Sequence, residues 1–220
     1  MSLTVFLNEL IHGKSLMRAQ TYSRIKGYEI SGTVLDLGSK LADAYHHRHL
    51  VQRDVKITFA DLYSQADDVV QVDLNKPLPF DDSSQDHILL FFVMEYLTEP
   101  TLCLSECERI LKPGGKILGA SPFITRPADD PVDLHRYTAA SIQRMLESSR
   151  FGSIKVDSIG TGPFGAALHQ LIPFIRPAWL RLPFIAAALF LDKLIRLKGG
   201  DRWRNIYPLG FVFEASSTSS

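Results

Sequence analysis

Neither sign of charge predominates in this sequence. Lysine plus arginine and aspartate plus glutamate each number 24 among the 220 residues. A chain without net charge lacks the general electrostatic field that draws nucleic acids or anionic membranes to strongly basic proteins. The composition therefore predicts no nucleic-acid partner, and any other partner must be recognised by a local surface.

Cysteine is scarce. The two cysteines, Cys103 and Cys107, lie one turn apart in a segment with a helical pattern. Adjacent turns of one helix are a poor place for a disulfide. We expect both to be small core residues of a reduced, cytoplasmic protein, with no metal or redox role.

Long apolar runs are also missing. The longest uncharged one, LPFIAAALFL at residues 182–191, is too short to cross a bilayer. The first residues, MSLTVFLNELIHGK, carry an acid inside their apolar run and no small-residue cleavage site, so no signal peptide is predicted. We expect a soluble protein with an apolar surface near its C-terminus.

Short apolar runs alternate with helical patterns along most of the chain, which is typical of a sheet flanked by helices. Several runs are apolar at nearly every position, as strands buried on both faces must be. The length suits one core, so a single domain over residues 1–220 is predicted. The seven predicted strands are TVLDL at 33–37, VKITFA at 55–60, DVVQVD at 68–73, DHILLFFV at 86–93, GKILGAS at 115–121, GSIKVDSIG at 152–160 and YPLGFVFEAS at 207–216.

Residues 163–198 break this alternation with a proline-punctuated apolar stretch that carries scattered basic residues. We expect two or three short helices inserted before the last strand. Four roles remain open for this insert: the lining of a pocket for a lipophilic acceptor, a homodimer interface, a peripheral membrane contact, or an ordinary packed helical cap. Residues 216–220, SSTSS, are predicted to be a disordered tail.

The order of motifs over residues 34–160 resembles the class I S-adenosylmethionine-dependent methyltransferases, in particular the type 11 group that acts on small molecules. The resemblance implies a Rossmann-like α/β fold with a seven-stranded, mostly parallel sheet. Its motifs are VLDLGS at 34–39, ITFADLY at 57–63, VVQVDLNKPLPFDDSSQDHILL at 69–90, VMEYL at 93–97, ERILKPGGKI at 108–117 and DLHRYTAASIQRMLESSRFG at 133–152.

The resemblance also implies a binding site for S-adenosylmethionine at the carboxyl ends of the first four strands, where parallel sheets bind their ligands. The turn after the first strand would contact the aminoacyl part of the cofactor. The aspartate that ends the second strand would bind the ribose, and the aspartate that ends the third strand would bind the adenine. The end of the fourth strand would contact the amino group of the cofactor. The implied cofactor residues are Asp36, Gly38, Ser39, Asp61, Leu62, Asp73, Leu74, Phe92 and Val93.

Each of these acids has a simpler interpretation, since an aspartate that ends a strand can start a turn by accepting a hydrogen bond from the backbone two residues on. A nicotinamide site is disfavoured, because the G-x-G-x-x-G fingerprint has Lys40 and Ala42 at its second and third glycines. If position 40 needs a positive φ, lysine there costs roughly 1–2 kcal/mol, about tenfold in affinity. The alternative, which the sequence leaves open, is that Lys40 is a solvated residue at the start of a helix and does not affect the cofactor.

Catalytic residues must follow the fourth and fifth strands, and a general base is needed only when the acceptor loses a proton. Glu95 and His135 are the candidates for a base, and Tyr96, His135 and Arg136 for substrate contacts, although Arg136 also suits an ion pair with Asp133. No metal site is predicted, because HHRH at 46–49 has no acid or cysteine within the run. Methyl transfer to a small acceptor, apolar or lipid-linked, is the leading hypothesis. The alternative is a degenerate relative that lost catalysis and serves as a binding or scaffold partner.

Overall fold

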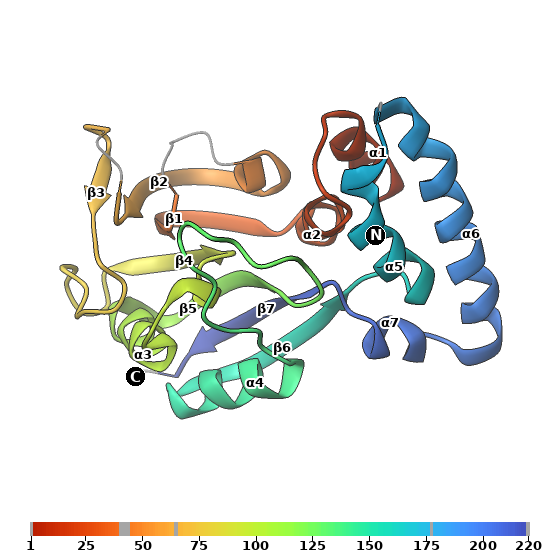
Figure 1. The fold of residues 1–220 in the computed structure, drawn as a ribbon. Coiled ribbons are helices and arrows are strands. Elements are labelled where there is room, and N and C mark those ends of the chain that lie inside the picture. The colour runs from red at the N-terminus through yellow and green to blue at the C-terminus, as the bar shows by residue number, and fades with distance from the viewer. Residues whose placement is uncertain (1, 40–44, 64–65, 177, 219–220) are drawn as a thin grey trace.

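A seven-stranded mixed sheet forms the centre of the computed structural model, which describes residues 2–39, 45–63, 66–176 and 178–218 (Figure 1). The strand order is β3-β2-β1-β4-β5-β7-β6. All neighbours are parallel except β7, which is antiparallel to β5 and β6. The predicted Rossmann-like fold is confirmed. The strands are β1 (Glu29–Leu37), β2 (Val51–Asp61), β3 (Val69–Gln71), β4 (Gln85–Phe91), β5 (Leu111–Pro122), β6 (Phe151–Ile159) and β7 (Gly210–Ser217).

Helices cover both faces of the sheet. The largest apolar cluster joins one face to α3 and α4, and it contains Cys103 and Cys107, both free and fully buried. A second cluster joins the other face to α2 through Tyr22 and Ile25. The cysteines are therefore core residues, as predicted. The helices are α1 (Leu3–Ile11), α2 (Leu16–Ile25), α3 (Pro100–Ile110), α4 (Ala139–Ser148), α5 (Pro163–Leu171), α6 (Arg181–Gly199) and α7 (Arg202–Ile206), with 3-10 turns at Tyr45–His49, Met94–Tyr96, Ile172–Phe174 and Ala178–Leu180.

The insert lies between β6 and β7, as predicted, but its helices are not all short. Helix α6 has 19 residues. Pro183 lies in its first turn, where the missing N–H has no intrahelical partner to lose, so this proline does not end the helix. No described helix is both long enough and apolar enough to span a bilayer.

The prediction of a disordered tail from residue 216 is wrong for its first two residues. Strand β7 continues through Ser217, which pairs with Phe151 at the edge of β6. Pairing with a neighbouring strand outweighs a polar, serine-rich composition here. Ser219 and Ser220 lie outside the described residues.

Candidate functional site

A cavity of about 250 Å³ lies at the carboxyl ends of the parallel strands. It gathers seven of the nine predicted cofactor residues from four consecutive strand ends. Sequence reasoning missed several neighbours, because loop residues that approach from elsewhere carry no local signal. The predicted residues that line it are Gly38, Asp61, Leu62, Asp73, Leu74, Phe92 and Val93, with Tyr96; the residues missed are Tyr63, Val72, Asn75, Leu97 and Pro131.

Gly38 fits this turn for two physical reasons. Its φ is +81°, and a Cβ there would lie 2.2 Å from Cγ2 of Val93. Its N–H donates to the carbonyl of Ala60 at 2.7 Å, which joins the turn to β2. A side chain at position 38 would therefore strain the backbone and collide with the segment that follows β4.

Asp61 and Asp73 both make the turn that the simpler interpretation predicts. One oxygen of Asp61 accepts from the N–H of Tyr63 at 2.8 Å, and one oxygen of Asp73 accepts from the N–H of Asn75 at 3.0 Å. The bond from Asn75, aided by Lys76 at 3.2 Å, lowers the pKa of Asp73. The turn uses one oxygen of Asp61 and is compatible with a second role for the other, whereas the second oxygen of Asp73 already lies 3.2 Å from Nζ of Lys76.

Phe92 joins this cavity to a second one. Its φ is +58°, which is uncommon for a bulky residue, and its N–H donates to the carbonyl of Ala120 at 2.7 Å. The guanidinium of Arg18 lies 5.3 Å from the centre of its ring. Backbone strain of this kind is often found at functional sites, so the outlier favours a site here.

The second cavity, of about 540 Å³, shares Phe92 and Tyr96 with the first and is lined by charged and polar side chains. Glu95 is 1% exposed, and its Oε2 has no hydrogen-bond partner among the described atoms. Burial, with the nearby charge of Asp133, raises the pKa of Glu95 to about 8, against the opposing effect of Arg136 and Arg18. With such a pKa the group is mostly protonated at neutral pH, and its ionised fraction, which grows as the pH approaches 8, is the form that can accept a proton.

The other predicted substrate residues lie elsewhere. Arg136 binds the carboxylate of Asp133 and the carbonyl of His135, so it ties the loop together. The ring of His135 lies 5.5 Å from that of Tyr137, and neither His135 nor Arg136 lines the two cavities. The geometry favours Glu95 over His135 as the base.

A third cavity, of about 690 Å³, adjoins the second, with which it shares the lining residues Ser15 and Arg126. The insert contributes Ile172, Phe174 and Leu182 to its wall. None of the described insert residues lines the first cavity. Among the described residues, the insert therefore borders the third cavity and not the first.

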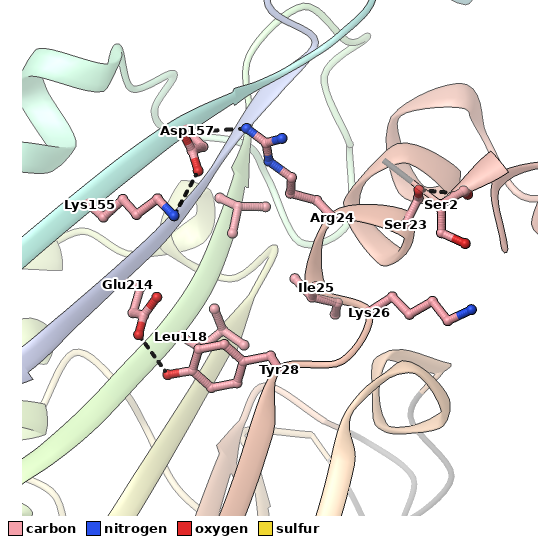
Figure 2. Close-up of a pocket in the computed structure, with 11 residues that line it drawn as sticks. Ser2, Ser23, Arg24, Ile25, Lys26, Tyr28, Leu118, Lys155, Asp157 and Glu214 are labelled. Carbon is pink, nitrogen blue, oxygen red and sulfur yellow. Dashed lines mark hydrogen bonds and ion pairs between the residues drawn. The ribbon is translucent and has the colours of Figure 1, made fainter.

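A separate cavity of about 580 Å³ lies between the end of α2 and the strands β5, β6 and β7 (Figure 2). Its polar groups bind one another: Tyr28 donates to Glu214 at 3.2 Å, and Arg24 lies 3.4 Å from Asp157. It shares no lining residue with the first two cavities. We therefore assign it no part in the site.

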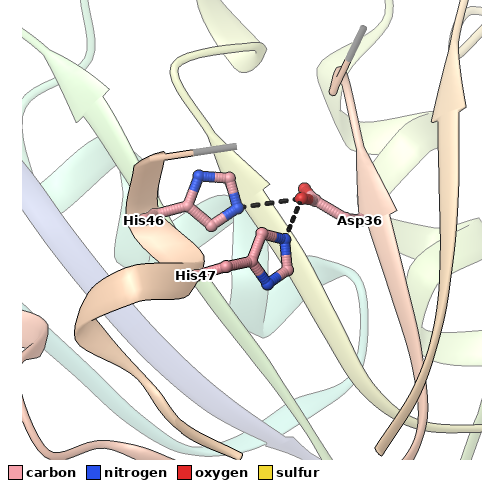
Figure 3. Close-up of side chains that lie close together, drawn as sticks. All are labelled: Asp36, His46 and His47. Atoms are coloured by element: carbon pink, nitrogen blue, oxygen red, sulfur yellow. Dashed lines mark hydrogen bonds and ion pairs between the residues drawn. The ribbon is translucent and has the colours of Figure 1, made fainter. Parts of the chain in front are cut away.

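The two remaining cofactor candidates, Asp36 and Ser39, are buried and do not line the first cavity. Figure 3 shows both Nε2 atoms of His46 and His47 directed at the carboxylate of Asp36. The distances to Oδ2 are 2.8 and 2.6 Å. The HHRH segment thus has an acidic partner in β1. The sequence analysis missed it because it considered only the residues inside that segment. Lys40 and Ala42 lie outside the described residues.

These three side chains are the one group of metal-ligating type among the described residues. Their contacts to a shared oxygen are hydrogen-bond lengths, whereas bonds of about 2.0 Å around a tetrahedral zinc ion would separate the ligand atoms by roughly 3.3 Å. Burial alone would raise the pKa of Asp36, but the bonds and charges of the histidines lower it. The geometry is that of a hydrogen-bonded cluster, and the absence of a metal stays a prediction.

Comparison with known proteins fits this geometry. Residues 13–119 match the family model described as a methyltransferase domain. This segment, just under half of the chain, is thus similar to the methyltransferase domain family. A relative, the methyltransferase ucsB of an Acremonium species, is 28% identical over 128 residues, which cover 52% of this chain and 38% of the relative. The alignment thus spans well under half of that relative's length.

Two solved structures share the fold of this chain. One is a chain of the complex between the Haloferax volcanii Trm112 methyltransferase activator and a methyltransferase, with a TM-score of 0.56 at 19% identity over 92% of this chain and 89% of that chain. The other is the [4+2]-cyclase SpnF, with a TM-score of 0.59 at 16% identity over 99% and 93%. At these identities the likeness concerns the fold alone.

Proposed function

We propose that this chain binds S-adenosylmethionine in the first cavity and transfers its methyl group to a small acceptor held in the second. The observation that carries the proposal is that seven predicted cofactor residues from four strand ends line one cavity, which adjoins the buried Glu95.

Each residue has a physical task in this proposal. The Asp61 oxygen that does not accept from Tyr63 would accept hydrogen bonds from a ribose, Leu74 packs against the adenine, and Gly38 allows the backbone to approach the aminoacyl part. The cofactor supplies a methyl group already activated by its sulfonium, so the protein mainly aligns the nucleophile. Glu95 takes the proton that an oxygen or nitrogen acceptor loses.

The adjoining cavities support an amphiphilic, lipid-linked acceptor. The inner one carries Glu95, Asp133 and Arg126, while the outer one has the apolar side chains Leu16, Ile172, Phe174, Leu182 and Ile185 beside the cations of Lys14, Arg176 and Arg181. A molecule with a polar nucleophilic end and an apolar tail fits this order of polar and apolar walls.

A second candidate function is a degenerate domain that kept the fold and serves as a binding partner. It is favoured by Asp36, which the histidines hold away from the cavity, and by Lys40 at a glycine position of the turn. A chain of this fold is named as a cyclase, and fold does not dictate chemistry.

Calorimetry with S-adenosylmethionine and its demethylated product tests both proposals. A working site binds both ligands in the wild-type protein, and Lys40→Gly changes the affinity little. A degenerate site binds weakly until Lys40→Gly restores it. No binding by either protein at millimolar ligand, with folding verified by circular dichroism, would sink the proposal of a cofactor site.

A further inference from the structure

The outer surface of the insert is unusually apolar. Ten of the twenty exposed large apolar side chains among the described residues lie within residues 163–198. Trp179 is 68% exposed and Leu197 is 78% exposed. Such a concentration marks an interaction surface rather than ordinary scatter. The ten residues are Phe164, Leu171, Phe174, Trp179, Leu182, Phe184, Phe190, Leu191, Leu194 and Leu197, and we call them, with the basic residues between them, the insert surface.

Helix α6 presents part of this surface away from the protein. Its buried residues, Ile185, Ala188 and Asp192, form one stripe. On the opposite side, apolar residues recur at spacings of four and three: Pro183, Ala187, Phe190, Leu194 and Leu197. Figure 1 shows α6 along the outer edge of the molecule, with no element beyond it. This outward stripe therefore has no partner within the described chain.

The charges on the insert have one sign. Residues 163–198 contain five lysines and arginines: Arg176, Arg181, Lys193, Arg196 and Lys198. The one acid, Asp192, is 3% exposed. It accepts from the N–H groups of Phe164 and Gly165 at 2.9 and 2.8 Å, so its charge faces inward. A neutral chain thus carries one local surface that is apolar and cationic.

The spacing of the outward stripe also suits a second copy of the chain, but the flanking charges oppose it. With Ala187 and Leu194 at a positions, Lys193 and Lys198 take g and e positions. Self-association would place lysine against lysine without a glutamate to compensate. An anionic lipid surface neutralises these cations and accepts the apolar and aromatic side chains between them.

We propose that the insert surface docks on anionic membrane surfaces, with the outward stripe of α6 lying in the interface. The outer cavity is bordered by Phe174, Arg176 and Leu182 of the same surface. A docked protein therefore has this outer cavity beside the bilayer. Docking depends on surface side chains and not on the cofactor, so it stands or falls apart from the proposed function.

Vesicle sedimentation without cofactor tests the proposal on the full chain. Phosphatidylcholine vesicles are compared with vesicles that also contain phosphatidylglycerol. We expect sedimentation with the anionic vesicles only, and its loss as salt is raised. The double variant Lys193→Glu/Lys198→Glu should weaken partitioning at least about tenfold, given the usual contribution of each cation near an anionic surface. Phe190→Ser/Leu197→Ser should weaken it about tenfold or more by removing apolar contacts.

Matched controls isolate the surface. Lys26→Glu/Lys56→Glu reverses two exposed lysines elsewhere, and Val132→Ser removes an exposed apolar side chain from a distant loop. Both should sediment like the wild type. Absence of sedimentation in folded wild-type protein overturns the proposal, as does equal binding to neutral vesicles. A dimer in analytical ultracentrifugation that Leu194→Glu dissociates, with no vesicle binding, identifies a second copy as the occupant and also overturns it.

Discussion

Two buried carboxylates lie at the carboxyl ends of neighbouring parallel strands of this sheet in opposite environments. Asp36, in β1, accepts hydrogen bonds from His46 and His47, and its pKa is lowered. Glu95, just beyond β4, has an oxygen with no partner among the described residues, and burial raises its pKa to about 8. Environments that shift the pKa values of two acids in opposite directions distinguish a carboxylate that stays charged for structural reasons from one that can exchange a proton. We infer that Asp36 stabilises the fold, while Glu95 is suited to proton transfer.

The largest expected effect is on stability at the first acid. Asp36→Ala leaves two buried histidines without their shared acceptor, and breaking a buried charged network costs about 3–5 kcal/mol. Urea denaturation at neutral pH measures the change in the free energy of unfolding. Asp67→Ala, at an exposed loop aspartate, is the matched control and should change it little. A loss below about 1 kcal/mol for Asp36→Ala would be expected only if the cluster were not formed.

The second acid should make stability depend on pH in the opposite sense. Between the ordinary pKa of 4.5 and the folded value of about 8, folded Glu95 keeps a proton that the unfolded chain has released. The free energy of unfolding should therefore fall as pH rises through this window, by up to about 1.4 kcal/mol per pH unit.

Glu95→Gln removes this titrating group, so the free energy of unfolding should change less with pH above pH 6. Glu147→Gln, at an exposed glutamate of α4, should keep the pH dependence of the wild type. Denaturation curves across the pH range give the three slopes. Equal slopes in wild-type and Glu95→Gln protein mean that Glu95 ionises normally and contradict the contrast with Asp36.

The regions around the two acids meet where Gly38 faces Val93, and this contact can be tested by substitution. Gly38→Ala combines a positive φ with a collision at 2.2 Å, while Gly13→Ala has a φ of +79° and open space around its Cβ. We expect about 1 kcal/mol for Gly13→Ala and a further 1–3 kcal/mol for Gly38→Ala. Thermal denaturation measures both. Val93→Ala in the Gly38→Ala background should recover part of the difference, and equal effects at the two glycines would exclude the close packing.

The smallest effect is expected across the cavity at Asp61. Asn at this position retains an oxygen for the turn to Tyr63 but loses the charge that the ribose hydroxyls would meet. Affinity for the demethylated cofactor should fall about fivefold to tenfold, with stability nearly unchanged. Competition binding with a fluorescent cofactor analogue gives the ratio. Unchanged affinity would assign Asp61 to the turn alone.

Much of the fold could be predicted because its signals are local. Apolar runs mark strands buried on both faces, and an aspartate at the end of a strand marks the edge where ligands bind. The cluster of Asp36, His46 and His47 could not be predicted, because it joins residues from separate elements. The raised pKa of Glu95 likewise depends on burial and on Asp133, which lies in a later loop. The length of α6 depends on Pro183 lying in the first turn, where a proline does not end the helix.

The central claim, a cofactor site at the strand ends, is tested most directly by titrating the demethylated cofactor into wild-type protein in a calorimeter. The proposal predicts saturable binding with one site per chain, weakened by Asp61→Asn and by Gly38→Ala but not by Gly13→Ala. No binding heat at millimolar ligand, in protein shown to be folded at the same temperature, would contradict it.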